Sequence, residues 1–184
     1  MTRTRVALAL AVLGYAGGLF TAQGSMQSLD VGRVLTADEL RAVDRTVFAD
    51  GRNLPPGSGT AIEGATVYGS RCRACHGAGG AGGPADRLVG GQGSLASAMP
   101  LKTVTSYWPY ATTLFDYIQR AMPLRSPGSL TSDEVYAVTA YLLAQGGIIG
   151  ETARMDASTL PRVEMPNRNG FRVDPRPAVG PFVR

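Results

Sequence analysis

The chain has 184 residues, 44% of them hydrophobic, and a formal net charge of +4, which suits one compact domain with extensions. Its 24 glycines and 12 prolines indicate that much of the chain forms loops. Two of the positive charges, Arg3 and Arg5, precede an apolar run, and without them the net charge falls to +2. This weak charge, with no basic run that alternates with aromatic residues, excludes nucleic acid as an expected partner.

The first residues have the pattern of an export signal. Arg3 and Arg5 form a positive start, residues 6–20 form a short apolar run, and small residues before Ser25 offer a cleavage site. The run is near the lower length limit for spanning a bilayer, and three glycines weaken it. We therefore predict a cleaved signal peptide at residues 1–24 and a periplasmic protein. If the segment stays uncleaved, it would anchor the chain in the membrane.

Residues 25–60 are predicted to form an N-terminal extension and linker. The sequence TADE at residues 36–39 fits a capping box, which starts a helix. Three apolar residues would share one face of that helix: Leu40, Val43 and Val47. The helix is expected to end near residue 50, and the Pro/Gly/Ser-rich residues 52–60 then exclude regular structure.

Residues 61–147 are predicted to form an all-α domain. A helix from 61 to about 74 leads into a glycine-rich loop at residues 77–83, and another helix spans about 112–121. The last helix begins at a second capping box, TSDE at residues 131–134, and ends at Gly146. Residues 148–184 contain many prolines and few apolar residues, so we expect an extended tail along the domain or a partner.

The chemistry is predicted from Cys72-Arg73-Ala74-Cys75-His76, a Cys-x-x-Cys-His motif. Two thiols within one helical turn can each add to a vinyl group of haem, and the next residue places its imidazole under the iron. Cys72 and Cys75 are therefore the expected attachment points for one covalent haem c, and His76 is its expected iron ligand.

Two other readings of the cysteines are weaker. A thioredoxin-like redox pair would normally follow a strand in a βαβ unit, and no such pattern precedes Cys72. A structural zinc site needs four ligands, whereas this chain has two cysteines and one histidine. Haem attachment is therefore the interpretation that the composition favours.

The single histidine excludes bis-histidine ligation within this chain, so a sixth ligand from the protein is expected to be methionine. Met122 is the preferred candidate, because it follows the third predicted helix and Pro123 and Pro127 can shape a loop over the open haem face. Met99 is the alternative, although it could equally be a packing residue. The remaining methionines lie near the N-terminus or in the tail.

Further residues are predicted around the haem. A backbone carbonyl at Gly83 or Pro84 could accept a hydrogen bond from the ring N–H of His76 and fix its tautomer. Tyr107 and Trp108, in an aromatic cluster with Tyr110, are expected to line the pocket by packing or by bonding a haem propionate. Two arginines could neutralise propionates or be ordinary surface residues: Arg87 and Arg125.

The order of these motifs resembles the class I cytochrome c fold. The resemblance covers about residues 61–146, from the helix and the Cys-x-x-Cys-His motif through Ala121-Met122-Pro123 to the capped last helix with Ala140-Tyr141-Leu142. It implies an all-α domain around one covalent haem, with His76 and Met122 as the iron ligands.

A narrower resemblance is carried by stretches outside the haem motif. They are DGRNLPPGSG at residues 50–59, YWPYATTLFDYI at residues 107–118, and residues 130–143 and 160–171. They look like the cytochrome subunits of bacterial sulfite dehydrogenase and of the related sulfur dehydrogenase, S-disulfanyl-L-cysteine oxidoreductase. The resemblance implies a molybdopterin-containing catalytic subunit as electron donor and another cytochrome c as acceptor, with no catalysis by this chain alone.

Two alternative functions remain at this point. The chain could be a free-standing diffusible carrier, although the extensions on both sides of the domain argue against it. It could also be a haem enzyme or sensor with an open sixth site, which requires that Met122 does not bind iron.

Overall fold

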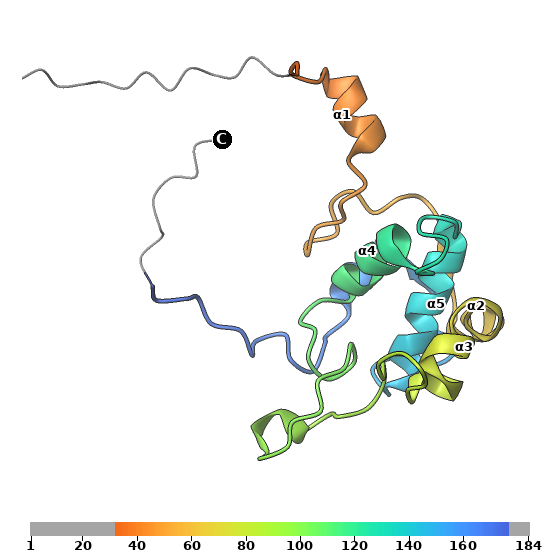
Figure 1. Cartoon of the computed structure of the whole chain (residues 1–184), viewed down its shortest axis with the longest axis vertical. Coiled ribbons are helices and arrows are strands. Elements are labelled where there is room, and N and C mark those ends of the chain that lie inside the picture. Colours follow the sequence, from red (N-terminus) through yellow and green to blue (C-terminus); the bar gives the residue numbers. More distant parts are fainter. Residues whose placement is uncertain (1–31, 177–184) are drawn as a thin grey trace, which may run out of the picture. The chain divides into compact units, whose positions relative to one another are not determined.

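The computed structural model describes residues 32–176, and the signal peptide predicted at residues 1–24 lies outside them. The chain divides into residues 1–36 and a compact unit that spans residues 37–184. The described helices and strands belong to the larger unit, and most are helical, as predicted (Figure 1). Among the described residues, no helix is long and apolar enough to cross a membrane.

The first helix, α1 (Ala37–Val43), is shorter than predicted. Leu40 and Val43 are exposed, whereas Val47 is buried at 5% exposure although it lies beyond the helix. The backbone N–H of Val47 donates to Asp116 Oδ1 at 2.8 Å, so this residue reaches the core from a loop. The expectation that these three residues share one helical face is therefore wrong, because a long-range contact places Val47.

Two helices begin with capping boxes, in which a threonine and a glutamate satisfy each other's free backbone amides. One is α2 (Ala61–Arg71), capped by Thr60 with Glu63. The other is α5 (Ser132–Gln145), where Thr131 and Glu134 confirm the predicted box. Because the local sequence fixes the N-terminus of each of these helices, both begin at defined residues.

Helix α5 lies between α2 and α4 (Ala111–Ala121), as Figure 1 shows. Its contact with α2 is close at Gly64, where an added Cβ would come within 1.9 Å of the carbonyl oxygen of Ala137. Nearby, the rings of Tyr68 and Tyr141 lie 4.8 Å apart. The three helices bury apolar side chains that form the centre of the core: Tyr68, Leu114, Phe115, Ile118, Val135, Tyr136, Val138, Leu142 and Leu143.

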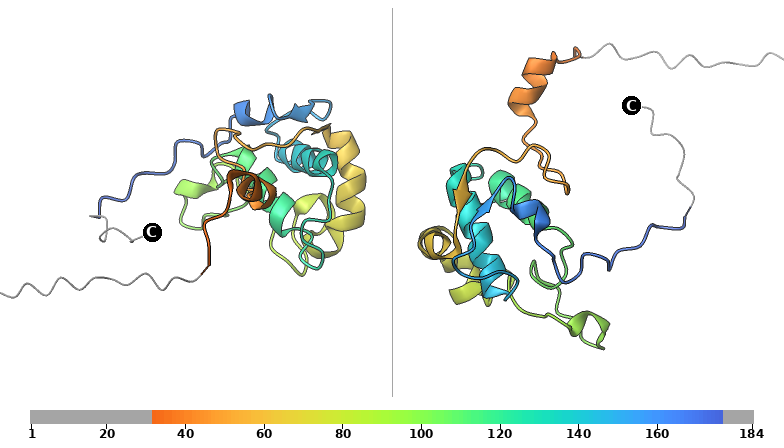
Figure 2. Two further views of the ribbon diagram at one scale, coloured as in Figure 1. Left: turned by 90° about the horizontal axis from the view of Figure 1, so that it is seen from above. Right: turned by 180° about the vertical axis from the view of Figure 1, so that it is seen from behind.

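The segments predicted as a linker and an extended tail are joined to each other. Strand β1 (Ser58–Gly59) pairs antiparallel with β2 (Met155–Asp156), with Gly59 opposite Met155. The 3-10 helix η3 (Leu160–Arg162) follows and packs on α4, and Figure 2 shows this segment in blue. Four apolar residues bury it in the core: Met155, Leu160, Val163 and Met165. The first part of the predicted tail is therefore part of the packed domain.

The remaining short elements are a helical turn in the Cys-x-x-Cys-His motif and two 3-10 turns in the loops that follow it. They are α3 (Arg73–His76), η1 (Ala78–Gly80) and η2 (Ser94–Ala96). Long irregular stretches connect them, as the glycine content predicts. This part of the fold positions the candidate site.

Candidate haem-binding site

The motif forms a turn that continues α2. Helix α2 ends at Arg71, and the carbonyl of Cys72 accepts backbone hydrogen bonds from Cys75 at 3.2 Å and from His76 at 3.0 Å. Cys72 is half-buried against the core, whereas Cys75 is exposed. Burial, with a smaller contribution from Cys75, raises the pKa of the Cys72 thiol to about 11. The two thiols are thus on one helical turn, and both are unpaired.

His76 is held by a backbone carbonyl. Its Nδ1 lies 2.9 Å from the carbonyl oxygen of Asp86. A carbonyl can only accept, so Nδ1 carries the proton and Nε2 keeps its lone pair for a metal. The acceptor is therefore Asp86, and the expectation for Gly83 or Pro84 is corrected. Pro84 itself is exposed, in a turn where Ala85 N–H donates to the Cys75 carbonyl.

The glycine loop after His76 depends on close backbone contacts. Gly77 has φ 75°, and a Cβ there would lie 2.1 Å from the carbonyl oxygen of Gly82. The buried Tyr68 hydroxyl donates to the Gly77 carbonyl at 2.8 Å. Burial raises the pKa of Tyr68 to about 12, so the hydroxyl remains a donor at neutral pH. The end of the motif is thus fixed to helix α2.

A cavity of about 270 Å³ opens beside His76. One side consists of Leu114, Ile118, Met122 and Leu142, which come from α4, its C-terminal cap and α5, and we call it the helical wall. The other side, the loop wall, consists of lining residues in the irregular segment 86–104: Asp86, Arg87, Leu88, Lys102, Thr103 and Val104. Trp108 and Tyr117 also line the cavity.

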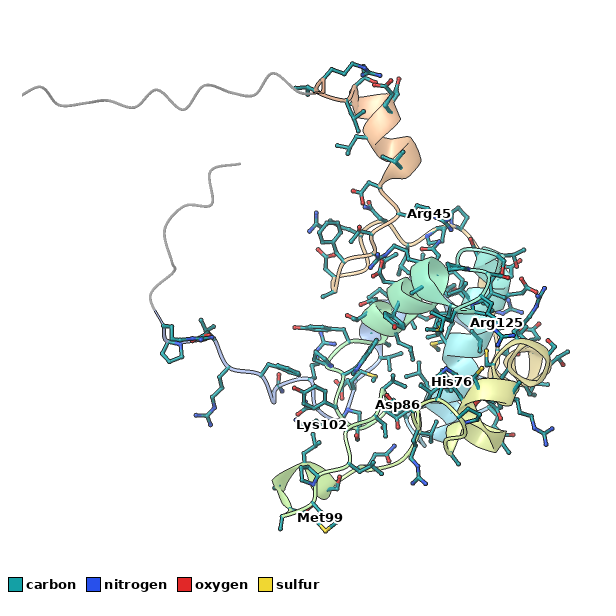
Figure 3. All side chains as sticks on the ribbon, in the orientation of Figure 1. Arg45, His76, Asp86, Met99, Lys102 and Arg125 are labelled. Carbon is teal, nitrogen blue, oxygen red and sulfur yellow. The ribbon has the colours of Figure 1, made fainter. Side chains whose placement is uncertain are left out.

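Met122, the predicted sixth ligand, shares a cavity with His76. It is the C-cap residue of α4, with its N–H donating to the Ile118 carbonyl at 3.1 Å, and it lines the same cavity as His76. Met99 is 87% exposed and lies away from His76 in Figure 3. Met155 and Met165 are buried in the core. Of these four methionines, only Met122 lines the cavity.

The aromatic cluster is divided between two environments. Trp108 lines the cavity, and its ring lies 5.8 Å from that of Tyr117 in an edge-on arrangement. Tyr107 does not line the cavity, because its ring packs on Phe171 of the C-terminal segment at 5.2 Å. Tyr110 stacks with Arg168 at 5.3 Å. The structure thus places Trp108, but not Tyr107, beside His76 and Met122.

The loop wall is held by hydroxyl groups. Thr103 Oγ1 donates to the Gly90 carbonyl at 2.6 Å and accepts from the backbone N–H of Ser106 at 3.1 Å. Ser106 Oγ donates to the Leu101 carbonyl at 2.8 Å, and Thr105 Oγ1 accepts from Gly90 N–H at 3.1 Å. All three hydroxyl residues are buried. This network replaces the backbone hydrogen bonds that a helix would provide.

Several cavity residues were not anticipated from the sequence. The Asp86 carbonyl, Lys102 and Thr103 belong to no motif, and nothing in their spacing marks them. The sequence Thr103-Val104-Thr105-Ser106 is rich in hydroxyl groups, and this is the one signal that could have indicated a turn fixed by side chains. Of the two arginines considered, Arg87 lines the cavity and Arg125 is exposed outside it.

The residues that surround the cavity fit a haem. An imidazole and a thioether, the ligand pair of many electron-transfer haems, line one cavity. Two thiols that could form thioether bonds lie on the turn that carries the imidazole. The walls are otherwise mainly apolar, which matches the porphyrin ring, and the basic residues match its carboxylates.

Comparisons with known proteins point to the same region. The family described as cytochrome c oxidase, cbb3-type, subunit III, matches residues 59–142, which contain the motif and Met122. Among solved structures, the sulfane dehydrogenase SoxCD from Paracoccus pantotrophus is 38% identical, with a TM-score of 0.75. That match covers 81% of this chain and 74% of the other. A search of curated protein sequences finds no match.

Proposed function

Because this chain belongs to the c-type cytochromes, in the family of the matched SoxCD chain, we propose that it is the periplasmic haem subunit of a molybdenum-dependent sulfite or sulfur dehydrogenase. As a c-type cytochrome it binds haem c covalently, which confirms the predicted cofactor, and its class I fold and electron-transfer function follow from the same membership. The observation that carries the electron-transfer function is that His76 and Met122 line one cavity, and the similarity to SoxCD carries the inference about the partner.

In this proposal each residue has one role. Cys72 and Cys75 bind the haem, and His76 and Met122 hold its iron. The Asp86 carbonyl orients His76 by accepting from Nδ1 at 2.9 Å, which leaves Nε2 for the iron. The apolar residues of the helical wall exclude water, and a dry site favours a defined potential. Bound haem supplies an iron that accepts and releases single electrons.

The partner is inferred from the relative. SoxCD is described as a sulfane dehydrogenase, and similarity over most of both chains supports a comparable assembly. This chain has two cysteines, both in the haem motif, so neither is left to hold molybdenum. We therefore infer that a separate molybdopterin subunit oxidises the sulfur compound and that this chain passes the electrons singly to another cytochrome c.

The iron ligands can be tested by spectroscopy. We expect the wild-type protein, made with the haem-maturation system, to be low-spin with a sulfur-to-iron charge-transfer band. Met122→Ala should remove that band, whereas the control Met99→Ala should keep it because Met99 is 87% exposed. A high-spin wild type that binds carbon monoxide readily would contradict electron transfer and favour an enzyme or sensor.

The partner can be tested by co-purification. Residues 155–165 belong to the core, so a truncation must begin later to leave the fold intact. A variant without residues 172–184 should keep its haem spectrum and associate less with a molybdenum dehydrogenase. Unchanged association would show that the tail does not dock to the partner. In a separate test, migration of the native protein as a free monomer in gel filtration would favour a diffusible carrier.

A further inference from the structure

We propose that Lys102 binds a carboxylate of the haem and that residues 165–171 hold Lys102 in position through Tyr107. The proposal rests on the haem site argued above. It assigns a function in that site to a lysine outside every recognised motif and to a segment that is remote in sequence.

The cavity lining contains two basic side chains, Lys102 and Arg87, and one acidic residue, Asp86. Figure 3 shows Lys102 and Asp86 on the same side of the molecule as His76. Arg87 already donates from Nε to the Ala81 carbonyl at 2.9 Å. Within residues 32–176, Lys102 makes no ion pair, and its ammonium contacts an aromatic ring.

A haem brings two carboxylates into this lining. A carboxylate that leaves bulk water needs a cation or hydrogen-bond donors to compensate for lost hydration. The Lys102 ammonium is the basic group at the cavity that is not engaged with a backbone carbonyl or a carboxylate in the described part of the chain. Its three N–H donors are therefore available to supply that compensation.

A chain of contacts leads from Lys102 to the C-terminal segment. Lys102 Nζ lies 5.1 Å from the centre of the Tyr107 ring, a cation–π distance. The Tyr107 ring meets Phe171 edge-on at 5.2 Å, and its carbonyl accepts from Asn167 Nδ2 at 2.7 Å. Met165, at 3% exposure, anchors the start of this segment in the core. Tyr107 is thus fixed by the segment and in turn contacts the lysine.

This arrangement links the tail to the reduction potential. A cation near the iron favours the reduced state, which carries one more electron, so loss of the Lys102 charge should lower the potential. Phe171 is 52% exposed, and its free side is available to a partner. Changes at Phe171 should therefore act on the potential through Tyr107 and Lys102.

The experiment measures the reduction potential of the haem-loaded full-length protein by spectroelectrochemistry. Lys102→Gln should shift the one-electron equilibrium constant about fivefold toward the oxidised state, which is about 40 mV at 59 mV per tenfold. Lys102→Arg keeps the positive charge and should therefore keep most of the wild-type potential. Arg125→Gln, an exposed cation outside the cavity, is the control for net charge and should leave the potential unchanged.

Phe171→Ala tests the positioning role. It should shift the equilibrium constant by about twofold in the wild-type background and not at all in the Lys102→Gln background, as expected for groups that act in series. Val173→Ala, at a 93% exposed position two residues beyond this segment, should have no effect in either background.

Three results would overturn the proposal. If Lys102→Gln has the same reduction potential as Arg125→Gln, Lys102 does not bind a haem carboxylate. A shift of Lys102→Gln that disappears in 1 M salt would assign it to a screened surface charge, since the Debye length is then about 3 Å. An undiminished effect of Phe171→Ala in the Lys102→Gln background would remove the positioning role. Failure of the proposed function would be seen separately, as a wild-type spectrum without methionine ligation.

Discussion

The two walls of the cavity are built in different ways. The helical wall takes its residues from α4 and α5, whose apolar side chains repeat at helical spacing. The backbone N–H and C=O groups of these helices bond to each other within the helix. The loop wall has little regular structure and depends on the hydroxyls of Thr103, Thr105 and Ser106 to satisfy its backbone. The difference indicates that mutations should affect the helical wall through packing and the loop wall through lost hydrogen bonds.

The strongest expected effect is on the packing that supports the helical wall. Gly64→Ala would place a Cβ 1.9 Å from the Ala137 carbonyl oxygen, so α2 and α5 must separate. We expect a loss of about 3 kcal/mol in the free energy of unfolding, measured by denaturant titration. Gly69→Ala, on the same helix with nothing within 4 Å, should instead stabilise by about 0.5–1 kcal/mol. Equal effects of the two variants would contradict close helix packing.

The loop wall should respond to the loss of one hydroxyl. Thr103→Val keeps the side-chain shape but removes the partner of the Gly90 carbonyl and of the Ser106 N–H. We expect about 2 kcal/mol of destabilisation, because buried polar groups are left unsatisfied. The control is Thr113→Val at an exposed position of α4, and thermal unfolding compares the two. If both variants have the same midpoint of thermal unfolding, the hydroxyl network does not support this wall.

A smaller effect is expected where the helical wall is tied to the N-terminal extension. The pKa of Asp116 is lowered overall. Burial alone would raise it, but the hydrogen bonds from Arg120 and from the Val47 N–H outweigh the effect of burial. A lowered pKa stabilises the fold above the unfolded-state value, near 3.9, and this stabilisation is lost as pH falls through the folded-state value. Asp116→Asn should therefore cost about 1 kcal/mol at pH 7, a figure reduced for the half-exposed Arg120.

The pH dependence provides the check on Asp116. The stability difference between the wild type and Asp116→Asn should shrink as the pH falls below about 4, because the wild-type carboxylate becomes protonated. Glu151→Gln, at an exposed carboxylate, should leave the curve unchanged. A difference that stays constant down to pH 2 would show that the charge of Asp116 is not responsible.

What the sequence predicted follows the same division. Helical spacing predicted α4, a capping box predicted the start of α5, and the Cys-x-x-Cys-His motif predicted the turn with Cys72, because these signals act over a few residues. The acceptor for His76 could not be predicted, since the Asp86 carbonyl is placed by the path of a loop. The same holds for Tyr107, which was expected at the haem and packs on Phe171, a contact across more than sixty residues. Long-range contacts leave little trace in local pattern.

The pairing of β1 with β2 has a consequence for the order of assembly. A chain is made from its N-terminus, so Cys72, Cys75 and His76 emerge long before the strand and η3 that close the core. Until Met155 and Leu160 arrive, α4 and α5 lack part of their buried contacts. The attachment residues thus precede, by some eighty positions in the chain, the segment that completes the packing of α4 and α5, so the haem motif and the closure of the core depend on separate parts of the sequence.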